Sequence, residues 1–326
     1  MKKLFLAASI ALAFSATAYA GSTVTIDGNG TVAGDGGLGV GALGWNNGNV
    51  ISIPVTGGSV APPKTGQIIQ NYGHAALANF VDANGDSIGG TGLHSKYEWT
   101  YVFGFQELVV TGGFASTFAT IAGGHNFFQI FYDPKKNSSN LKGTGFNDGP
   151  FLPKGNPILT GHILTPDGKG HGISTFTSTS ASAGALDQFG ANNYPKVKSV
   201  SGNGSGRFQI AVDSYNTDFF QASPTITELA FDTFQNLVYQ QQNPSSCFWD
   251  GSKLINGVGP NTDPSKGPCK MNTVGATNGL SGPNVVFESR ATNDFVTAVP
   301  EPGSLALIGL GLAGLGGMAR RRREAV

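Results

Sequence analysis

Apolar and polar residues alternate along the middle of the chain in short runs with a period of two. The clearest run, KYEWTYVFGFQELVV, spans Lys96 to Val110 and places an aromatic side chain at every second position from Tyr97 to Phe103. Successive side chains of a strand point to opposite faces of a sheet. This run therefore predicts a half-buried strand.

Similar runs recur along the chain and predict further strands. They lie at Phe114 to Ile121, Asn126 to Tyr132, Leu159 to Leu164, Tyr194 to Val200, Phe208 to Val212, Ile226 to Phe234 and Val285 to Ser289, with a weaker edge strand at Val24 and Ile26. Gly-Gly pairs, Asp133-Pro134 and polar loops separate the runs, as expected for hairpins. The prediction is an all-β fold, an antiparallel β-sandwich-like domain with long Gly/Ser/Asn-rich loops.

Three segments between these runs are harder to assign. The Ser/Thr-rich stretch Ser174 to Ala185 is either a flexible loop or an outer strand of small residues. Gly202 to Gly206 (GNGSG) is glycine-rich like a phosphate-binding loop, but no Lys-Ser/Thr follows and no helix begins there, so it predicts a hairpin turn. A long loop from Gln240 to Leu280 holds both cysteines.

Composition supports many turns between short strands. The chain has 49 glycines and only 12% charged residues, and its aromatic content of 10% is too high for simple disorder. No internal repeat at a solenoid period is present. The central part, residues 21–299, is long enough for one large all-β domain or two smaller ones.

The N-terminus predicts export. Lys2 and Lys3 precede an apolar run, and the small residues Ala18 and Ala20 stand ahead of Gly21. This is the layout of a secretory signal peptide, residues 1–20, with cleavage before Gly21.

The C-terminus predicts a removable anchor, residues 300–326. It begins with Pro300, Glu301 and Pro302, continues through an uncharged apolar segment from Ser304 to Ala319, and reaches a basic cluster, Arg320, Arg321, Arg322 and Arg323. An apolar helix of about 17 residues is near the lower limit for crossing a bilayer. The arginines stay on the cytoplasmic side by the positive-inside rule, which leaves the preceding chain outside. Small residues from Gly309 to Gly317 either pack helices closely or weaken the helix for extraction, and we favour the second reading.

The neutral formal charge hides a mildly acidic central part. Removing Lys2, Lys3 and the four arginines from 20 basic residues leaves 14, and removing Glu301 and Glu324 from 20 acidic residues leaves 18, a net charge near −4. The chain also lacks a basic stripe. Both features argue against nucleic acid as a partner.

The two cysteines, Cys247 and Cys269, both lie in the exported part. An oxidising compartment favours a disulfide between them, closing a loop of about 20 residues. Two free thiols are the alternative. A zinc site is disfavoured because no histidines stand at ligand spacing.

No motif for metal binding or catalysis stands out. Asp82 to Asp86 (DANGD) has clustered oxygens, but its glycine and its missing glutamate do not fit an EF-hand, so a polar turn is the better reading. No G-x-S-x-G motif surrounds a serine, and the five histidines lie beside glycines or in loops. We therefore expect no catalytic residue, no metal and no cofactor.

The C-terminal sequence resembles the PEP-CTERM sorting signal: VPEPG, then apolar residues, then RRRR. The resemblance implies recognition and processing by an exosortase after transient insertion in the inner membrane of a Gram-negative bacterium. The central part also resembles flocculation-associated PEP-CTERM proteins, in the pieces GWNNGN, YEWTYVFGFQE, NFFQIFYDPKKNSSNLKGTGFNDG, LDQFGANNYPKVKSVSGNGSG, DFF and VVFESRATNDFVTAVPEPG.

This second resemblance implies a non-enzymatic role in floc or biofilm formation through exopolysaccharide, with the secretion machinery and an exosortase as other partners. Trp249 and Trp45 are the candidates for stacking on sugar rings, whereas Trp99, on a strand, is expected in the core. A secreted polysaccharide hydrolase and a calcium-dependent carbohydrate-binding module are the alternatives.

Overall fold

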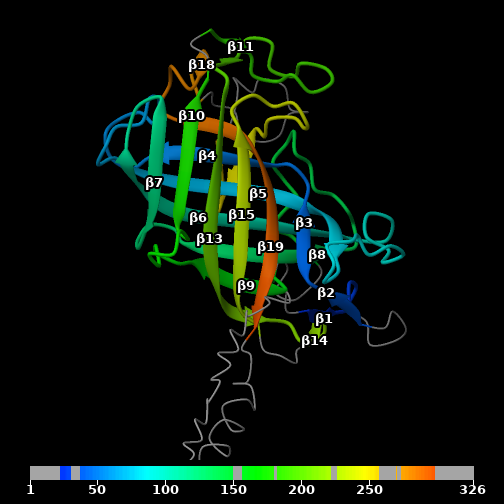
Figure 1. The fold of residues 1–326 in the computed structure, drawn as a ribbon. Helices are drawn as coiled ribbons and strands as arrows, with labels where there is room; N and C mark the ends of the chain where they lie inside the picture. Colours follow the sequence, from blue (N-terminus) through cyan, green and yellow to red (C-terminus); the bar gives the residue numbers. More distant parts are fainter. Residues whose placement is uncertain are drawn as a thin grey trace, which may run out of the picture.

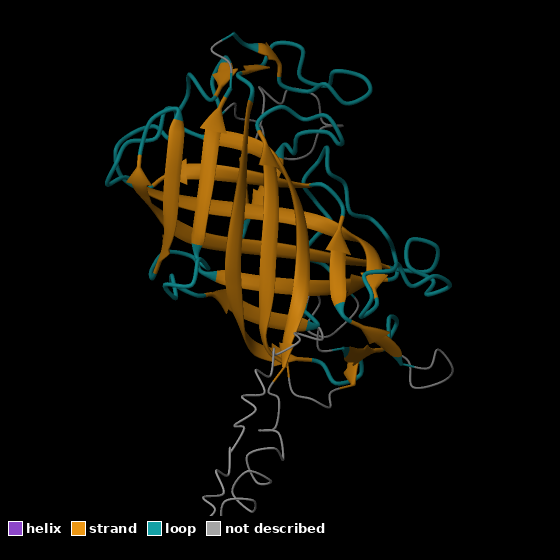
Figure 2. Cartoon of the chain, in the orientation of Figure 1, coloured by secondary structure: helices purple, strands orange, loops and turns teal. Residues whose placement is uncertain are grey.

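The computed structural model describes residues 23–30, 37–149, 156–179, 182–221, 226–256, 269 and 273–297. The predicted signal peptide, residues 1–20, and the predicted tail, residues 300–326, lie outside these residues. Throughout the described ranges the regular structure is β-strand, as predicted (Figure 2). None of the described segments forms a helix that is long and apolar enough to cross a membrane.

An antiparallel sheet of eleven strands folds into two layers whose strands cross at a steep angle (Figure 1). One layer holds β3 (Ala42–Trp45), β7 (Ala115–Ile121), β10 (Ile173–Ser178), β13 (Gly202–Tyr215), β15 (Ile226–Asn236) and β19 (Val285–Thr297). The other holds β4 (Gly48–Pro54), β5 (Ile68–Val81), β6 (Glu98–Thr111), β8 (Phe127–Asp133) and β9 (Leu159–Ile163). Hydrogen-bonded pairs β6–β7, β9–β13, β3–β5 and β4–β19 connect the layers along their edges.

Three small sheets lie around the two layers. The first holds β1 (Val24–Ile26), β2 (Leu38–Val40) and β14 (Phe220–Gln221); the second holds β11 (Gly184–Ala185), β12 (Lys198–Ser199) and β18 (Thr277–Asn278); the third holds β16 (Cys247–Trp249) and β17 (Leu254–Asn256). The first two sheets lie near opposite ends of the layered body (Figure 1). β1 confirms the strand predicted at Val24 and Ile26.

The main core fills the space between the two layers and is rich in aromatic rings. Tyr101 of β6 lies near its centre, 4.7 Å from Trp45 in an edge-to-face contact and 5.7 Å from Phe231 of the facing layer. Each such aromatic pair adds about 0.5–1.5 kcal/mol beyond the burial of its surface. Trp99 is fully buried, as predicted.

β6 is buried on both faces, so the prediction of a half-buried strand is wrong for the face opposite the core. Glu98 accepts hydrogen bonds from the backbone amide and the hydroxyl of Ser138, and the Thr100 hydroxyl donates to the carbonyl of Phe146. Loops that follow β8 therefore cover this face and supply partners for its polar side chains.

Several predicted strands are confirmed with shifted ends: β6, β7, β8, β9, β15 and the start of β19. The segment Tyr194 to Val200 is a strand only at Lys198–Ser199. The Ser/Thr-rich stretch Ser174 to Ala185 contributes to two strands, β10 (Ile173–Ser178) and β11 (Gly184–Ala185). The predicted turn at Gly202 to Gly206 is wrong, because these residues begin β13. Their inner faces are covered by the rings of Phe176 and Phe208, which occupy the space that glycine leaves free.

Candidate functional site

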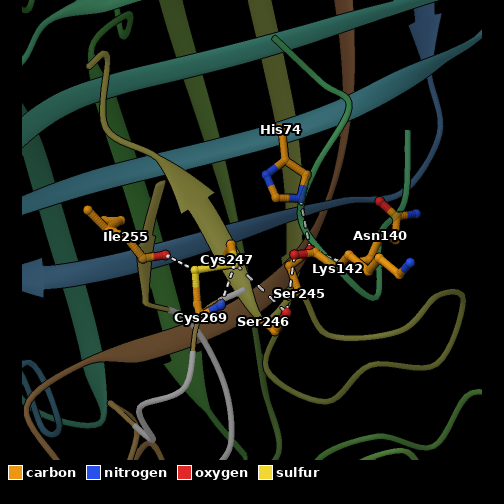
Figure 3. Close-up of a disulfide and its surroundings, with 8 residues drawn as sticks. All are labelled: His74, Asn140, Lys142, Ser245, Ser246, Cys247, Ile255 and Cys269. Atoms are coloured by element: carbon orange, nitrogen blue, oxygen red, sulfur yellow. Dashed lines mark hydrogen bonds between the residues drawn. A yellow bond between two sulfur atoms is a disulfide. The ribbon is translucent and has the colours of Figure 1, made fainter. Parts of the chain in front are cut away.

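We call the segment between β15 and β19 the insertion. Its described residues 237–256 pack against the outer face of β4 and β5, and a disulfide joins its two cysteines. Cys247 and Cys269 are bonded, with their Cα atoms 5.4 Å apart, which confirms the predicted pairing (Figure 3). Next to it, the Ser246 hydroxyl donates to the carbonyl of Lys142. Phe248 is fully buried in a second apolar cluster with Ile51 and Tyr72.

His74 of β5 fixes this insertion to the sheet (Figure 3). Its Nε2 lies 2.8 Å from the hydroxyl of Ser245, which itself donates to the carbonyl of Asn140, so the ring donates to Ser245. The ring stacks on Phe146 at 4.1 Å and contacts Phe248. Burial lowers the pKa of His74 to about 3, which keeps the ring neutral.

Beside the insertion, an open groove of about 440 Å³ runs over the outer face of the β4–β5–β6 layer. Its lining combines polar and aliphatic side chains: Ile53, Val55, Gln70, Tyr72, Gln106, Gly124, His125, Asp250, Lys253 and Ile255. Val55, at 52% exposure, is an accessible apolar contact. The insertion thus forms one wall of the groove and the sheet forms its floor.

The loop between β7 and β8 lies against the floor through paired hydrogen bonds. The Gln70 amide donates to the carbonyl of His125 at 2.9 Å and accepts from its backbone amide at 3.1 Å. Gly124, with φ +59°, permits this approach, since a Cβ there would lie 2.4 Å from the Gln70 oxygen and 2.3 Å from the Gln106 amide nitrogen. Only glycine keeps both glutamine amides in place.

Two polar side chains of the groove carry hydrogens and lone pairs that a ligand can use. His125 Nδ1 lies 2.6 Å from the carbonyl oxygen of Asp250 and 3.0 Å from the Tyr72 hydroxyl. A carbonyl only accepts, so Nδ1 carries the proton, and the Tyr72 hydroxyl keeps its own proton for another acceptor. Burial raises the pKa of Tyr72 to about 12, with a smaller contribution from the charge of Asp250, so this hydroxyl stays a donor.

Asp250 shapes the wall of the groove. Burial by itself would raise the pKa of this carboxyl, but hydrogen bonds from the amides of Lys253 and Ser252 and from the Ser252 hydroxyl outweigh it and lower the pKa. The ionised side chain closes a tight turn between β16 and β17 that presents Lys253 at the surface. The groove therefore has a lysine on its wall and amide groups on its floor.

The structure separates the two predicted sugar-stacking residues. The prediction for Trp45 is wrong: the ring is 2% exposed, packs on Tyr101 and donates from Nε1 to Asn293 Oδ1 at 2.6 Å, so no face is open to a ligand. Trp249 is half-buried, packs beside Val102 and Phe131, and directly precedes the Asp250 turn.

The turn predicted at Asp82 to Asp86 is confirmed. The Asp82 carboxylate accepts the backbone amides of Asn84 and Asp86, which lowers the pKa of this carboxyl. In the described part of the chain no three His, Cys, Asp or Glu side chains gather in a geometry that would hold a metal ion. The predicted processing residues Ala18, Ala20, Gly21, Pro300, Glu301 and Pro302, and Arg320, Arg321, Arg322 and Arg323, lie outside the described residues.

Sequence patterns did not identify the groove residues on β5. The run IIQNYGHAALANFV alternates poorly because both faces of β5 are covered, and its polar residues have specific partners in the insertion, in the loop between β7 and β8 and in the neighbouring strands β4 and β6. The only signal in this region was the disulfide loop, which pointed to the wall of the groove and to Trp249.

The comparisons with known proteins concern the C-terminus. Searches of curated proteins and of solved structures each found no match to the chain. Residues 298–323 match the family model of the PEP-CTERM protein-sorting motif. This span includes the predicted Pro-Glu-Pro sequence and the arginine cluster. The chain thus carries a PEP-CTERM sorting motif, which implies an exported, cell-surface protein that is sorted by an exosortase.

Proposed function

We propose that this exported protein contributes to floc or biofilm formation by binding exopolysaccharide at the cell surface, without catalysing a reaction. The observation that carries the proposal is the open groove on the β4–β5–β6 layer, whose lining mixes amide, hydroxyl, imidazole and ammonium groups with exposed Val55. Saccharides present hydroxyls beside apolar ring faces, and this mixture of groups complements both.

The shape of the groove favours a polymer over a small molecule. It is open along the surface, and its floor consists of strands held by hydrogen bonds on both sides. A rigid platform loses little conformational entropy when a chain of sugars binds. Trp249, beside the wall, is the residue whose ring we propose for additional sugar contact.

The test measures retention of the host's exopolysaccharide by the immobilised full-length chain. Tyr72→Phe removes one hydroxyl from the groove and keeps the ring, so we expect retention to weaken roughly 3- to 10-fold, the effect of about one hydrogen bond. Tyr215→Phe, on β13 away from the groove, is the matched control and should leave retention unchanged. Trp249→Ala should also weaken retention. An unchanged midpoint of thermal unfolding in this variant shows that the loss is not caused by unfolding.

Three outcomes would count against the proposal. Equal retention by wild type and Tyr72→Phe would remove the groove as the binding site. Release of soluble oligosaccharides during incubation would replace binding by hydrolysis. Loss of retention on chelation of calcium would favour a calcium-dependent carbohydrate-binding module instead.

A further inference from the structure

A second space lies inside the molecule, between the two layers and separate from the surface groove. It is a cavity of about 110 Å³, comparable to the cavities of about 150 Å³ that hold a benzene molecule in a protein core. It reaches the surface beside Pro62, Pro63 and Phe114, the last of which is 63% exposed. A ligand the size of one six-membered ring fits this space.

The walls of the cavity are largely aromatic. Phe103 and Phe105 project from β6, and Phe208 and Phe231 project from the facing β13 and β15. The rings contact one another across the layers, with 5.0 Å between the centroids of Phe105 and Phe208 and 5.7 Å between those of Phe103 and Phe231. Aromatic faces attract both apolar groups and cations.

One carboxyl group lies among these rings. Glu107 of β6 is 6% exposed and lines the cavity. The Ser174 hydroxyl donates to its Oε1 at 2.7 Å, and the Asn71 amide donates to its Oε2 at 2.7 Å. The Ser52 hydroxyl donates to Asn71 Oδ1 at 2.5 Å, which turns the NH₂ group of Asn71 toward the carboxyl. Both hydrogen bonds to Glu107 thus suit the ionised form.

The carboxyl has no cationic partner within the described structure. Among the described residues that line the cavity, Glu107 is the one charged or titratable side chain. The side chains that face its carboxyl from β4, β5 and β10 are the neutral Ser52, Asn71 and Ser174. Burial raises the pKa of Glu107 to about 7, while the two donors oppose that rise. A buried carboxylate is costly unless a charge pairs with it.

We propose that this cavity binds a small organic cation, an ammonium group on an apolar body of about one ring, with the ammonium against Glu107 and the apolar body among Phe103, Phe105, Phe208 and Phe231. The ammonium supplies the charge that the carboxylate lacks and donates to the free lone pairs of Oε1 and Oε2. The surrounding rings contribute a cation–π attraction that a neutral ligand of equal shape does not receive.

The proposal is tested by calorimetric titration of the full-length chain with benzylamine, benzyl alcohol and toluene. These probes share one ring and differ in the charge and hydrogen bonding of one group. We expect benzylamine to bind at least 10-fold more tightly than benzyl alcohol or toluene at about pH 8, the effect of one charge-assisted hydrogen bond. Nuclear Overhauser contacts between the probe and phenylalanine ring protons should locate it in the cavity.

Glu107→Gln keeps the shape of the side chain and removes its charge, so benzylamine should lose that 10-fold preference while toluene binds as before. Glu228→Gln, on the outer face of β15, is the matched control and should change neither affinity. In the wild type, affinity for benzylamine should rise from about pH 5 to about pH 8 as Glu107 ionises. This pH series decides the question even if the Glu107→Gln chain fails to fold.

Equal affinity for benzylamine and benzyl alcohol across that pH range would overturn the proposal and identify the cavity as a site for neutral ligands. Absence of binding by all three probes would also overturn it. Neither result bears on exopolysaccharide retention, which depends on the separate groove.

Discussion

At the scale of single residues, His74 makes the stability of the fold sensitive to acid. Its pKa is lowered from 6.5 to about 3 by burial, so the folded state holds the ring neutral while the unfolded chain protonates near pH 6.5. The folded state binds fewer protons, and the free energy of unfolding therefore falls as pH drops from about 6.5 toward 3. The full effect is on the order of 5 kcal/mol.

Urea unfolding between pH 3 and pH 7 measures this contribution. His74→Gln should flatten the acid slope while lowering stability at pH 7, because the ring contacts with Phe146 and Phe248 are also lost. The exposed His162, which pairs with Asp213 on the surface, provides a matched His162→Gln control that should keep the slope. An unchanged slope in His74→Gln would show that another group causes the acid sensitivity.

Glu107 has the opposite effect on stability. Its pKa is raised from 4.5 to about 7, so the folded state binds more protons than the unfolded chain between these values. The resulting stabilisation is complete below about pH 4.5 and is lost as pH rises through 7, with a total of roughly 3 kcal/mol.

Glu107→Gln should remove that decline, so its free energy of unfolding should rise relative to wild type as pH goes from about 4.5 to 7. Because His74 and Glu107 act in opposite directions between about pH 4.5 and 6.5, their contributions partly cancel there in the wild type, and the flattening expected for His74→Gln is measured below about pH 4.5. A constant difference between Glu107→Gln and wild type at every pH would contradict a raised pKa.

At the scale of elements, β13 depends on the alternation of glycine with polar residues. Gly202, Gly204 and Gly206 face inward and are buried, while Asn203 and Ser205 face solvent. A Cβ on Gly204 would lie 2.3 Å from the carbonyl oxygen of Thr175 and 2.8 Å from the ring of Phe176. At these three positions the inner face of β13 carries no side chains, and residues of the neighbouring β10 occupy that space.

Gly204→Ala should destabilise the fold by about 2 kcal/mol or more, because β10 must move to admit the methyl group. Ser205→Ala, one residue away on the exposed face, should change stability by less than about 0.5 kcal/mol. Thermal unfolding of both variants checks the contrast. Similar midpoints would mean that β10 can shift at little cost and that the inner face of β13 is not tightly packed.

β13 also shows what the sequence can and cannot predict. Strands with aromatic residues at alternate positions, such as β6 and β8, are recognisable because one face meets the core. In GNGSG the inward positions are glycines, which have no apolar side chain, so the sequence shows no alternation of apolar and polar residues. The run instead has the composition of a turn. β5 was missed for a related reason: His74 and Tyr72 lie under the insertion, and this contact depends on residues far away in sequence.

The same limit applies to the candidate sites. The disulfide was predictable from compartment and cysteine number, and it pointed to the wall of the groove. Glu107 gave no local signal, since its partners Asn71 and Ser174 come from two other strands. The prediction that Trp45 is open to a sugar failed because its Gly/Asn-rich neighbours in the sequence are typical of an exposed loop. In the structure its indole lies in the core and donates a hydrogen bond to Asn293 of β19.

At the scale of the whole molecule, the sorting motif predicts a chain that is shortened after export. Residues 298–323 include the apolar segment and Arg320 to Arg323, and we propose that exosortase processing removes them. Mass spectrometry of the protein recovered from the cell surface should therefore find a C-terminal peptide that ends before Arg320. Recovery of peptides that still contain the arginine cluster as the main form would contradict processing.

The disulfide joins the stability of the insertion to the function proposed for the groove. It links residues 22 positions apart, a constraint of about 3 kcal/mol in the chain-entropy model. Both bonded cysteines lie in the insertion, whereas the strands of the two layers are held together by hydrogen bonds between one another. Reduction should therefore favour local opening of the insertion while the layers stay folded.

Hydrogen exchange of the oxidised and reduced protein distinguishes local from global opening. We expect amides of residues 245–256 to exchange faster after reduction, and those of β13 and β15 to keep their protection. Polysaccharide retention should decline with the protection of residues 245–256, because Asp250 and Lys253 form the groove wall. A uniform loss of protection would instead mean that the insertion and the layers unfold as one cooperative unit, and that the groove is as stable as the core beneath it.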